Sequence, residues 1–230
     1  MARPLPRAFF ARDADVVARD LLGRTLVHET PRGGRLSARI VETEAYFGPP
    51  TRNAHLAQRD DMRATLRRRL LKEGDPASHS FRGVTHRNRV MYGPPGYWYV
   101  YLIYGMHECA NVVTGPKGRS GEFTQSDRFE PQAVLLRAAE ALDGRDQMPR
   151  TDLRGPAKLC HAMGITRAAY GLDATKRPLW FEEGAPVARV DVTARIGVAS
   201  DLPLRFVEQD SPFASRRTKG SSKLRASAAR

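Results

Sequence analysis

Cysteine, acidic side chains and long apolar runs are all scarce in this chain of 230 residues. Its two cysteines, Cys109 and Cys160, are too few for a disulfide framework, a cysteine-rich zinc site or an iron–sulfur cluster. We therefore expect no metal and no cofactor. No apolar run approaches the roughly 20 residues that cross a bilayer, and the N-terminal stretch lacks the apolar run of a signal peptide. These absences predict a cytoplasmic protein that has no contact with a membrane.

The charges that are present are strongly unbalanced. Lys and Arg number 38 against 25 Asp and Glu, which gives a formal net charge of +13. An excess of this size favours a polyanionic partner, and nucleic acid is the commonest one. With 41% hydrophobic residues, the chain can bury the core of a single domain over residues 1–214. Residues 215–230 contain no acid, and we expect them to form a disordered tail that adds non-specific affinity for phosphates.

The expected secondary structure is mixed, and turns of hairpin length join several of its strands. The sequence predicts helices over 13–23, 52–72 and 155–163. It predicts strands over 25–29, 35–45, 97–104, 111–114, 133–139, 187–198 and 204–207. This order favours the α+β class: a single mixed domain with a curved, largely antiparallel β-sheet flanked by helices.

Two glutamates stand out in the segment RIVETEAYFGPP. A strand places Glu42 and Glu44 on one face, about 6–7 Å apart, which suits an acid and a base in glycosidic bond chemistry. The alternative is a solvated strand face with ion-paired glutamates, which we favour for Glu42. Tyr46 adds a ring on which a base could stack beside Glu44. A glycan hydrolase would use the carboxylates but not the basic charge, whereas an enzyme that cuts N-glycosidic bonds in DNA would use both.

A second aromatic segment, YWYVYLIYGM at residues 97–106, places Tyr97, Tyr99 and Tyr101 on one face of a strand. Such a stripe is ordinarily core packing. Beside a surface that binds a polyanion it could instead stack bases, each worth ~1–3 kcal/mol. Tyr104 and Met106 lie at the turn that follows, where an apolar tip could wedge into a duplex.

Together these motifs resemble the alkyladenine DNA glycosylase family. The segments RIVETEAYFGP, SHSFRGVTHRN, YVYLIYGMHECANV, AVLLRAAE and GPAKLCHAMGI follow one another in the family's order, over about residues 9–215. The resemblance implies a monofunctional, monomeric glycosylase of base excision repair, associated with the nucleoid. Such an enzyme binds the minor groove of double-stranded DNA, flips out a damaged purine and leaves an abasic site. The implied substrates are 3-methyladenine, 7-methylguanine, hypoxanthine and ethenoadenine.

The resemblance also assigns roles to matching positions. Glu44 becomes the general base that activates water, Arg137 supports that water and the phosphate of the flipped nucleotide, and the main chain near Ile196 helps to hold the water. Tyr104 and Met106 fill the gap left in the stack. The base-binding residues are Tyr46, Ser78, His79, Tyr101 and Asn111. Two plainer readings stay open: Arg137 as a strand arginine paired with Glu42 or Glu140, and Asn111 as a structural turn residue.

One segment departs from the family's pattern. The family has a pocket histidine shortly after its EAY motif, and here His55 and His79 compete for that place. We prefer His79, in DPASHSFRG, because local context fixes backbone geometry better than distance along the chain does. Residues 51–74 are then an inserted basic helix, and His55 is a surface residue.

Four arginines are expected to contact the DNA backbone: Arg63 and Arg67 in this helix, and Arg87 and Arg89 after it. A solvated helix face is the alternative for the first two.

Two other classes of function remain open. The first is a non-catalytic nucleic-acid-binding module on the same fold, although binding alone gives no reason to place the Glu44 anion in a DNA groove. The second is a glycan hydrolase that uses Glu42 and Glu44, whose affinity would not fall with salt as phosphate binding does. Release of free base from alkylated DNA separates both from a glycosylase.

Overall fold

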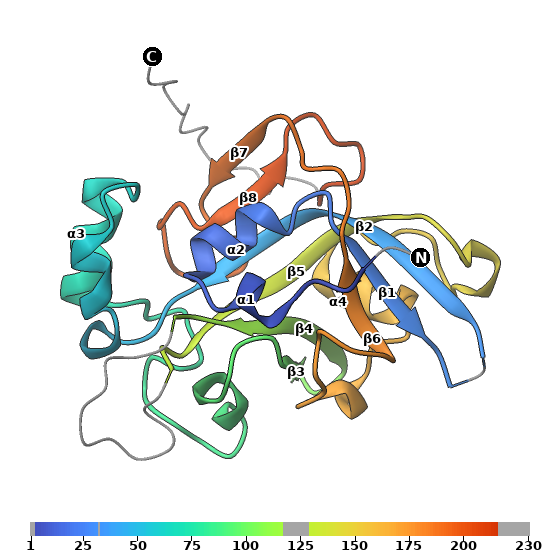
Figure 1. Ribbon diagram of the computed structural model, residues 1–230, viewed down its shortest axis with the longest axis horizontal. Coiled ribbons are helices and arrows are strands. Elements are labelled where there is room, and N and C mark those ends of the chain that lie inside the picture. The colour runs from blue at the N-terminus through green and yellow to red at the C-terminus, as the bar shows by residue number, and fades with distance from the viewer. Residues whose placement is uncertain (1–2, 32, 117–128, 216–230) are drawn as a thin grey trace.

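One antiparallel sheet organises the protein in the computed structural model, which describes residues 3–31, 33–116 and 129–215 (Figure 1). Its strands are β1 (Thr25–Glu29), β2 (Arg35–Tyr46), β3 (Trp98–Ile103), β4 (His107–Thr114), β5 (Gln132–Ala141), β6 (Leu179–Glu182), β7 (Val190–Thr193) and β8 (Arg205–Glu208). They follow the order β3-β4-β5-β2-β1-β6, and β8 pairs with both β2 and β7. Every strand pairing is antiparallel, so the expected α+β class is confirmed.

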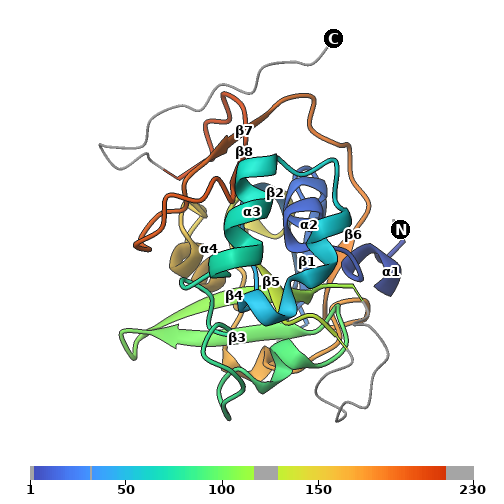
Figure 2. The same ribbon diagram turned by 90° about the vertical axis from the view of Figure 1, so that its left-hand side faces the viewer.

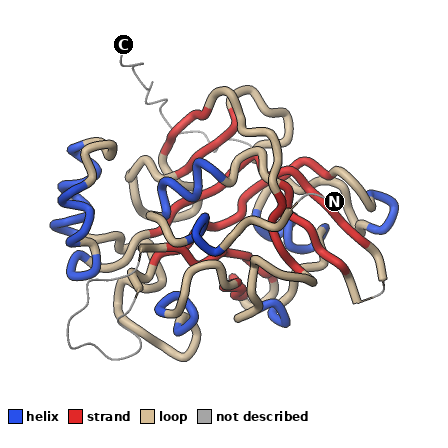
Figure 3. The backbone as a smooth tube through the Cα atoms, viewed as in Figure 1, coloured by secondary structure: helices blue, strands red, loops and turns tan. Residues whose placement is uncertain are grey.

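Helices are few and lie around the sheet (Figure 3). The α-helices are α1 (Arg7–Phe10), α2 (Ala14–Asp20), α3 (Ala64–Glu73) and α4 (Pro156–Ala162). Short 3-10 turns are η1 (Pro50–Arg52), η2 (Ala54–Gln58), η3 (Arg89–Tyr92), η5 (Arg145–Gln147) and η6 (Arg167–Ala169). In the described part of the chain, no helix has the length and apolar character needed to cross a membrane.

The segment expected as one basic helix, 51–74, is helical as expected only in its second half. It begins with the turns η1 and η2, and α3 follows. Between them Arg59 forms ion pairs with Asp13 and Asp15 at the start of α2, 2.7 and 3.1 Å long. One continuous helix was expected over 52–72, but residues 59–63 form no helix, and Arg59 makes this tertiary contact. The expectation that residues 52–63 belong to the same helix as α3 was therefore wrong.

His55 was also misplaced by the sequence argument. It lies in η2, where its Nε2 is 2.6 Å from Asp13 Oδ1, and its side chain is 21% exposed. Asp13 Oδ1 also accepts a hydrogen bond of 2.9 Å from Gln132. His55 is thus a half-buried member of a polar cluster beside α2, and not a surface residue, because this part of the chain packs against the helix.

The strand expected over 187–198 was too long. Of residues 187–198, only those of β7 join the sheet. After β7 the chain leaves the sheet, and there the Arg195 side chain binds Asp75 and the Ile196 amide binds Glu44. Conversely, α1 and β6 were not expected. Each is four residues long, which is too short for a periodic pattern to show.

A β-bulge in β2 decides which side chains face the site. The register of β2 against β5 shifts twice between Ile40 and Thr43, where Glu42 pairs with Ala138. Core residues of β2 have even numbers before the shift and odd numbers after it: Leu36, Ala38 and Ile40, then Ala45. Because a one-residue shift exchanges the faces of a strand, Glu42, Glu44 and Tyr46 turn away from the core that packs under α2.

The two faces of the sheet carry separate hydrophobic clusters. The larger one lies under α2 and includes Trp98, Val112 and Val134. The smaller one consists of Met91, Tyr92, Tyr99, Val113 and Ala133. Since successive strand residues alternate between faces, the second cluster lies on the opposite side of β3, β4 and β5. Figure 2 shows the β3–β4 hairpin projecting beyond the rest of the sheet on one side of the molecule.

Candidate active site

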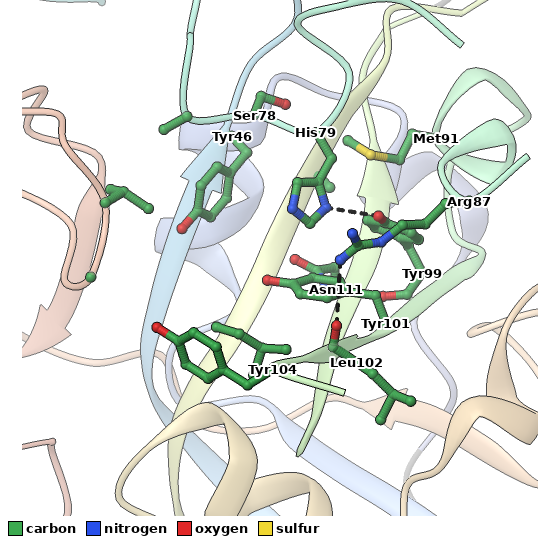
Figure 4. A pocket seen from close by; sticks show the side chains of 15 residues that line it. Tyr46, Ser78, His79, Arg87, Met91, Tyr99, Tyr101, Leu102, Tyr104 and Asn111 are labelled. Atoms are coloured by element: carbon green, nitrogen blue, oxygen red, sulfur yellow. Dashed lines mark hydrogen bonds between the residues drawn. The ribbon is translucent and has the colours of Figure 1, made fainter. Parts of the chain in front are cut away.

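A cavity of about 360 Å³ opens on the face that carries the smaller cluster. Side chains from separate strands and loops converge on it (Figure 4). Its lining contains six of the expected base-contacting or wedge residues: Tyr46, Ser78, His79, Tyr101, Tyr104 and Asn111. This volume and its aromatic lining suit a flat ring system of the size of a purine.

Glu44 lies directly behind Tyr46 and is completely buried. Its Oε1 accepts a 2.8 Å hydrogen bond from the Ile196 amide, and its Oε2 accepts a 2.9 Å hydrogen bond from the Tyr46 hydroxyl. The guanidinium of Arg137 lies 3.5 Å from Oε1. Burial raises the pKa of Glu44, while Arg137 and the Ile196 amide oppose that rise. Glu44 does not itself line the cavity, but it is bonded to Tyr46, which does. A carboxylate with a raised pKa next to a cavity is suited to general base work.

Glu42 forms a buried network with two arginines. Its Oε1 accepts hydrogen bonds from Arg137 Nε at 3.0 Å and from Arg205 Nε at 2.6 Å. Ser215 donates its amide and its hydroxyl to the same carboxylate, at 2.6 and 2.7 Å. Glu42 is ion-paired as expected, but it is 0% exposed, so the solvated strand face was wrong. The bulge explains the error, because it buries this face against β8 and the segment that ends at Ser215.

Arg137 therefore touches both carboxylates. Of the two partners considered for it, Glu42 is the observed one, whereas Glu140 lies 3.8 Å from Arg39. Pairing with Glu42 does not remove Arg137 from the site, since it also lies 3.5 Å from Glu44. Arg137 sits within the bulged part of β5, between residues that pair with Glu42 and Thr43.

His79, rather than His55, lines the cavity. Its Nδ1 is 2.7 Å from the Tyr99 hydroxyl, and its ring stands 4.6 Å from that of Tyr101 at an angle of 69°. One edge of His79 is open to solvent, yet packing among these rings lowers its pKa to about 4, helped by the charge of Arg87. The imidazole is accordingly neutral near pH 7 and can donate from one nitrogen and accept at the other.

The remaining polar groups of the cavity are tied to the protein. Asn111 donates from its amide to the Tyr99 carbonyl at 3.0 Å, and the hydroxyls of Ser78 and Ser80 are 2.9 Å apart. Asn111 lies in β4 and not in a turn, so the turn reading does not apply.

The turn between β3 and β4 presents two exposed apolar side chains. Tyr104 is 86% exposed and Met106 is 67% exposed. Tyr104 has a φ of +52° and Gly105 a φ of +71°, both in the left-handed region. A left-handed Tyr is unfavourable by about 1–2 kcal/mol, so the rest of the hairpin imposes this conformation. Tyr104 also lines the mouth of the cavity, so wedge and cavity adjoin.

The four arginines expected at the DNA backbone occupy different places. Arg87 lies over the Tyr101 ring, 5.0 Å from its centroid, and lines the cavity. Arg89 lines a neighbouring basic hollow of about 910 Å³ with His86, Arg87 and Arg167. Arg63 precedes α3, and Arg67 on α3 donates to the Arg59 carbonyl at 2.6 Å. Neither of these two lines the cavity, and their contact with DNA stays a prediction.

Sequence reasoning missed Arg195 and Asp75. They form a buried ion pair behind Tyr46, with two contacts of 2.7 Å. Arg195 directly precedes Ile196, and Asp75 is the first residue of DPASHSFRG, so both lie in segments that the resemblance pointed to. A single sequence gives no sign that side chains 120 positions apart are partners.

A known protein family matches most of this chain in sequence. The model of the methylpurine-DNA glycosylase family matches residues 8–67 and 70–212. The chain belongs to this family. The two matched ranges are interrupted at 68–69, inside α3 and inside the segment expected as an insertion; a longer insertion stays a prediction. The expected resemblance and the class of enzyme, a DNA glycosylase, are thereby confirmed.

Individual relatives match this chain over nearly its whole length. A protein of Methanocella arvoryzae is 41% identical over 94% of this chain and 98% of its own length. A protein of Carboxydothermus hydrogenoformans is 40% identical over 93% of this chain and 99% of its own length. A protein of Anaeromyxobacter dehalogenans is 41% identical over 96% of this chain and 90% of its own length. All three are provisionally named 3-methyladenine DNA glycosylases.

Proposed function

We propose that this glycosylase flips alkylated or deaminated purines out of double-stranded DNA and hydrolyses the N-glycosidic bond with a water that Glu44 activates. It approaches from the minor groove, acts as a monomer in base excision repair and works at the nucleoid. The observation that carries the proposal is the place of Glu44: a buried carboxylate with a raised pKa, bound by the Ile196 amide and by the hydroxyl of Tyr46, whose side chain lines the aromatic cavity.

The chemistry needs one base and no strong acid for a cationic purine. Water forms a bond to C1′ of the sugar and loses a proton to Glu44, while the bond from C1′ to the purine nitrogen breaks and its electron pair neutralises the alkylated ring. The negative charge of Glu44 also stabilises the positive charge that develops on the sugar. In the free protein the Tyr46 hydroxyl occupies Glu44 Oε2, so the water uses the second lone pair or displaces that hydroxyl.

Binding of the base uses the rings and the tied polar groups of the cavity. Tyr46 and Tyr101 offer faces for stacking, and the neutral His79 supplies hydrogen bonds to a neutral purine such as hypoxanthine. Asn111, fixed by its bond to the Tyr99 carbonyl, would crowd the 2-amino group of guanine. Substrates are then 3-methyladenine, hypoxanthine and ethenoadenine, which lack that group, and 7-methylguanine, which carries it but is a cation and leaves without a strong acid. Normal guanine carries the group and is neutral, so it is disfavoured.

DNA is held by cations and by the exposed turn. Arg87 and Arg89 lie at the cavity and the adjoining hollow, where they would contact phosphates, and Arg63 and Arg67 would extend this contact. Tyr104 and Met106 would fill the space that the flipped nucleotide leaves. Arg137, already beside Glu44, would reach the phosphate of the flipped nucleotide.

The glycan hydrolase reading loses support from Glu42. Both carboxylates are buried, but only Glu44 is bonded to a residue that lines the cavity, Tyr46. The oxygens of Glu42 are held by two arginines and Ser215, away from the lining. A non-catalytic binding module would have no use for a Glu44 oriented by two hydrogen bonds. The wild-type protein and its Glu44→Gln variant separate these functions.

The test uses duplexes that each carry one lesion, followed by cleavage at abasic sites. The parent should release free base from 7-methylguanine and hypoxanthine duplexes. Glu44→Gln should bind the same duplexes at least as tightly, because an anion facing DNA is removed, and should release no base. Substantial base release by Glu44→Gln would contradict the role of Glu44. Tight binding without any release by the parent would leave a binding module as the function.

A further inference from the structure

The buried ion pair of Asp75 and Arg195 connects three walls of the cavity. Both side chains are 0% exposed, and the guanidinium donates to both carboxylate oxygens at 2.7 Å. Removing two charges from water is costly, so such a pair needs good geometry and further hydrogen bonds to be tolerated. Both partners have such bonds: Arg195 donates to Ala45 and Ser200, and Asp75 accepts from Phe47 and Ala77. Ala77 lines the cavity, and Ala45 and Phe47 flank Tyr46, which also lines it. Among the described residues, Arg195 Nε has no hydrogen-bond partner.

Arg195 supports the two groups that bind Glu44. Its Nη1 donates to the Ala45 carbonyl at 2.9 Å, and its guanidinium lies over the Tyr46 ring, 4.4 Å from the centroid. The peptide that follows Arg195 carries the Ile196 amide, which donates to Glu44 Oε1. The Tyr46 hydroxyl donates to Glu44 Oε2. Displacing the guanidinium would therefore loosen the hydrogen bonds at both oxygens of Glu44.

Asp75 fixes the chain on either side of the excursion that contains α3. Its Oδ2 accepts from the Phe47 amide at 3.0 Å, directly after Tyr46. Its Oδ1 accepts from the Ala77 amide at 3.3 Å, at the start of the wall formed by Ser78 and His79. The Asp75 amide in turn donates to the Gly48 carbonyl at 3.2 Å. One carboxylate thus joins the end of β2 to the loop that carries His79.

The turn before Asp75 leaves little freedom for another arrangement. Gly74 has a φ of +67°, and a Cβ at this position would lie 2.7 Å from the backbone nitrogen of Pro50. After the excursion through α3 the chain therefore returns to the segment that directly follows β2, and Asp75 lies beside Gly48 there. Its position follows from the backbone and does not depend on a flexible side chain.

We propose that Asp75 and Arg195 are positioning residues for base excision, which hold Tyr46, the Ile196 amide and the His79 loop in register around Glu44. The pair contacts no substrate in this proposal and acts through these three groups. The inference rests on the proposed function for its activity readout alone. Its electrostatic part is independent: burial raises the pKa of Glu44, and the charges of Arg137 and Arg195 oppose that rise.

Two variants separate the geometry from the charge. Arg195→Lys keeps the cation but loses the planar fork that binds both oxygens of Asp75. The double variant Asp75→Asn/Arg195→Gln removes both charges without leaving one of them buried alone. Arg59→Lys is the matched control, since it disrupts a largely buried arginine network with Asp13 and Asp15, away from Glu44.

Three measurements are made on each full-length variant: the melting temperature, the single-turnover rate of 7-methylguanine release against pH, and the titration of Glu44 by carboxyl ¹³C NMR. The Glu44 resonance is the one that Glu44→Gln lacks. In the double variant Glu44 should titrate at higher pH, and the acid limb of the pH–rate profile should move in the same direction. Release of 7-methylguanine should be about 10²-fold slower, the order expected for an ångström of misplacement. Arg195→Lys should slow release with little change in the titration.

The control fixes the interpretation. Arg59→Lys should lower the melting temperature and leave both the titration and the rate profile as in the parent. The inference is overturned if a folded double variant titrates and excises like the parent, or if Arg59→Lys changes the two profiles equally. If the double variant does not fold, parent-like excision by Arg195→Lys overturns it and slow excision supports it. If the parent releases no base while the titration still moves, the proposed function fails and the positioning role stands.

Discussion

Replacing Glu42 by glutamine should destabilise the protein strongly, although Glu42 was first expected on a solvated strand face. The substitution keeps the shape of the side chain and removes the negative charge that two buried guanidiniums share. Its new amide must face either those guanidiniums or the Ser215 amide, so a donor meets a donor in either orientation. Breaking a buried ion pair from one side costs about 3–5 kcal/mol, against a total stability of roughly 5–15 kcal/mol.

Thermal unfolding followed by circular dichroism measures this cost. For a chain of this size 1 kcal/mol corresponds to about 2–4 °C, so Glu42→Gln should melt roughly 6–20 °C below the parent. Glu73→Gln is the matched control, because Glu73 is half exposed and its partner Arg69 is 3.7 Å away. An exposed pair of this kind contributes about 0–1 kcal/mol. Equal melting temperatures for the two variants would refute the reasoning and show that the buried charge of Glu42 contributes little to stability.

Further predictions concern the reaction itself. Because burial raises the pKa of Glu44 and only the carboxylate accepts a proton, release of 7-methylguanine should fall on acidification at a pH above the ~4.3 of a free glutamate; a pH–rate profile with its acid limb at or below that value would contradict the burial argument. His79→Ala should slow hypoxanthine release more than 7-methylguanine release, since a neutral base depends more on pocket hydrogen bonds. His55→Ala should lower the melting temperature and leave that ratio unchanged, and the reverse ranking would show that the wrong histidine was chosen. Tyr104→Ala should leave stability unchanged, since the ring is 86% exposed, and should disfavour the flipped state by a few kcal/mol. Fluorescence of 2-aminopurine at the target reports that flipping, and lesions opposite an abasic site should lose less. Parent-like flipping by Tyr104→Ala would contradict the wedge role of Tyr104.

The sequence predicted what local patterns determine. Most strands and the antiparallel class follow from alternation and hairpin turns, and α2 follows from its apolar period and the glycine after it. Placing Glu42 and Glu44 on one face needed only the two-residue period of a strand. The family motifs located Tyr46, His79, Tyr101 and Tyr104, and the cavity does bring these four together.

What the sequence could not supply are contacts between distant segments. Whether the face of Glu42 is solvated depends on Arg205 and Ser215, which lie more than 160 positions away. The Asp75–Arg195 pair spans 120 positions. The expected long helix was wrong in its first half, where Arg59 pairs with Asp13 and Asp15 at the start of α2. These partners too are distant in the sequence. Periodicity describes one element at a time and carries no information on such partners.

The buried charges explain how a basic protein can carry carboxylates beside the cavity that we propose receives a flipped base. Glu42 and Glu44 are matched by Arg137 and Arg205, so this buried group has no net charge, and the pair behind Tyr46 is neutral as well. The chain's formal charge of +13 is then free to attract phosphates without opposition from Glu44, the base in the proposed mechanism. The bulge in β2 makes this possible, because it turns Glu44 towards the cavity and Glu42 towards the two arginines. It follows that removing the Glu44 charge leaves the group with one net positive charge, which should favour DNA binding while it abolishes chemistry.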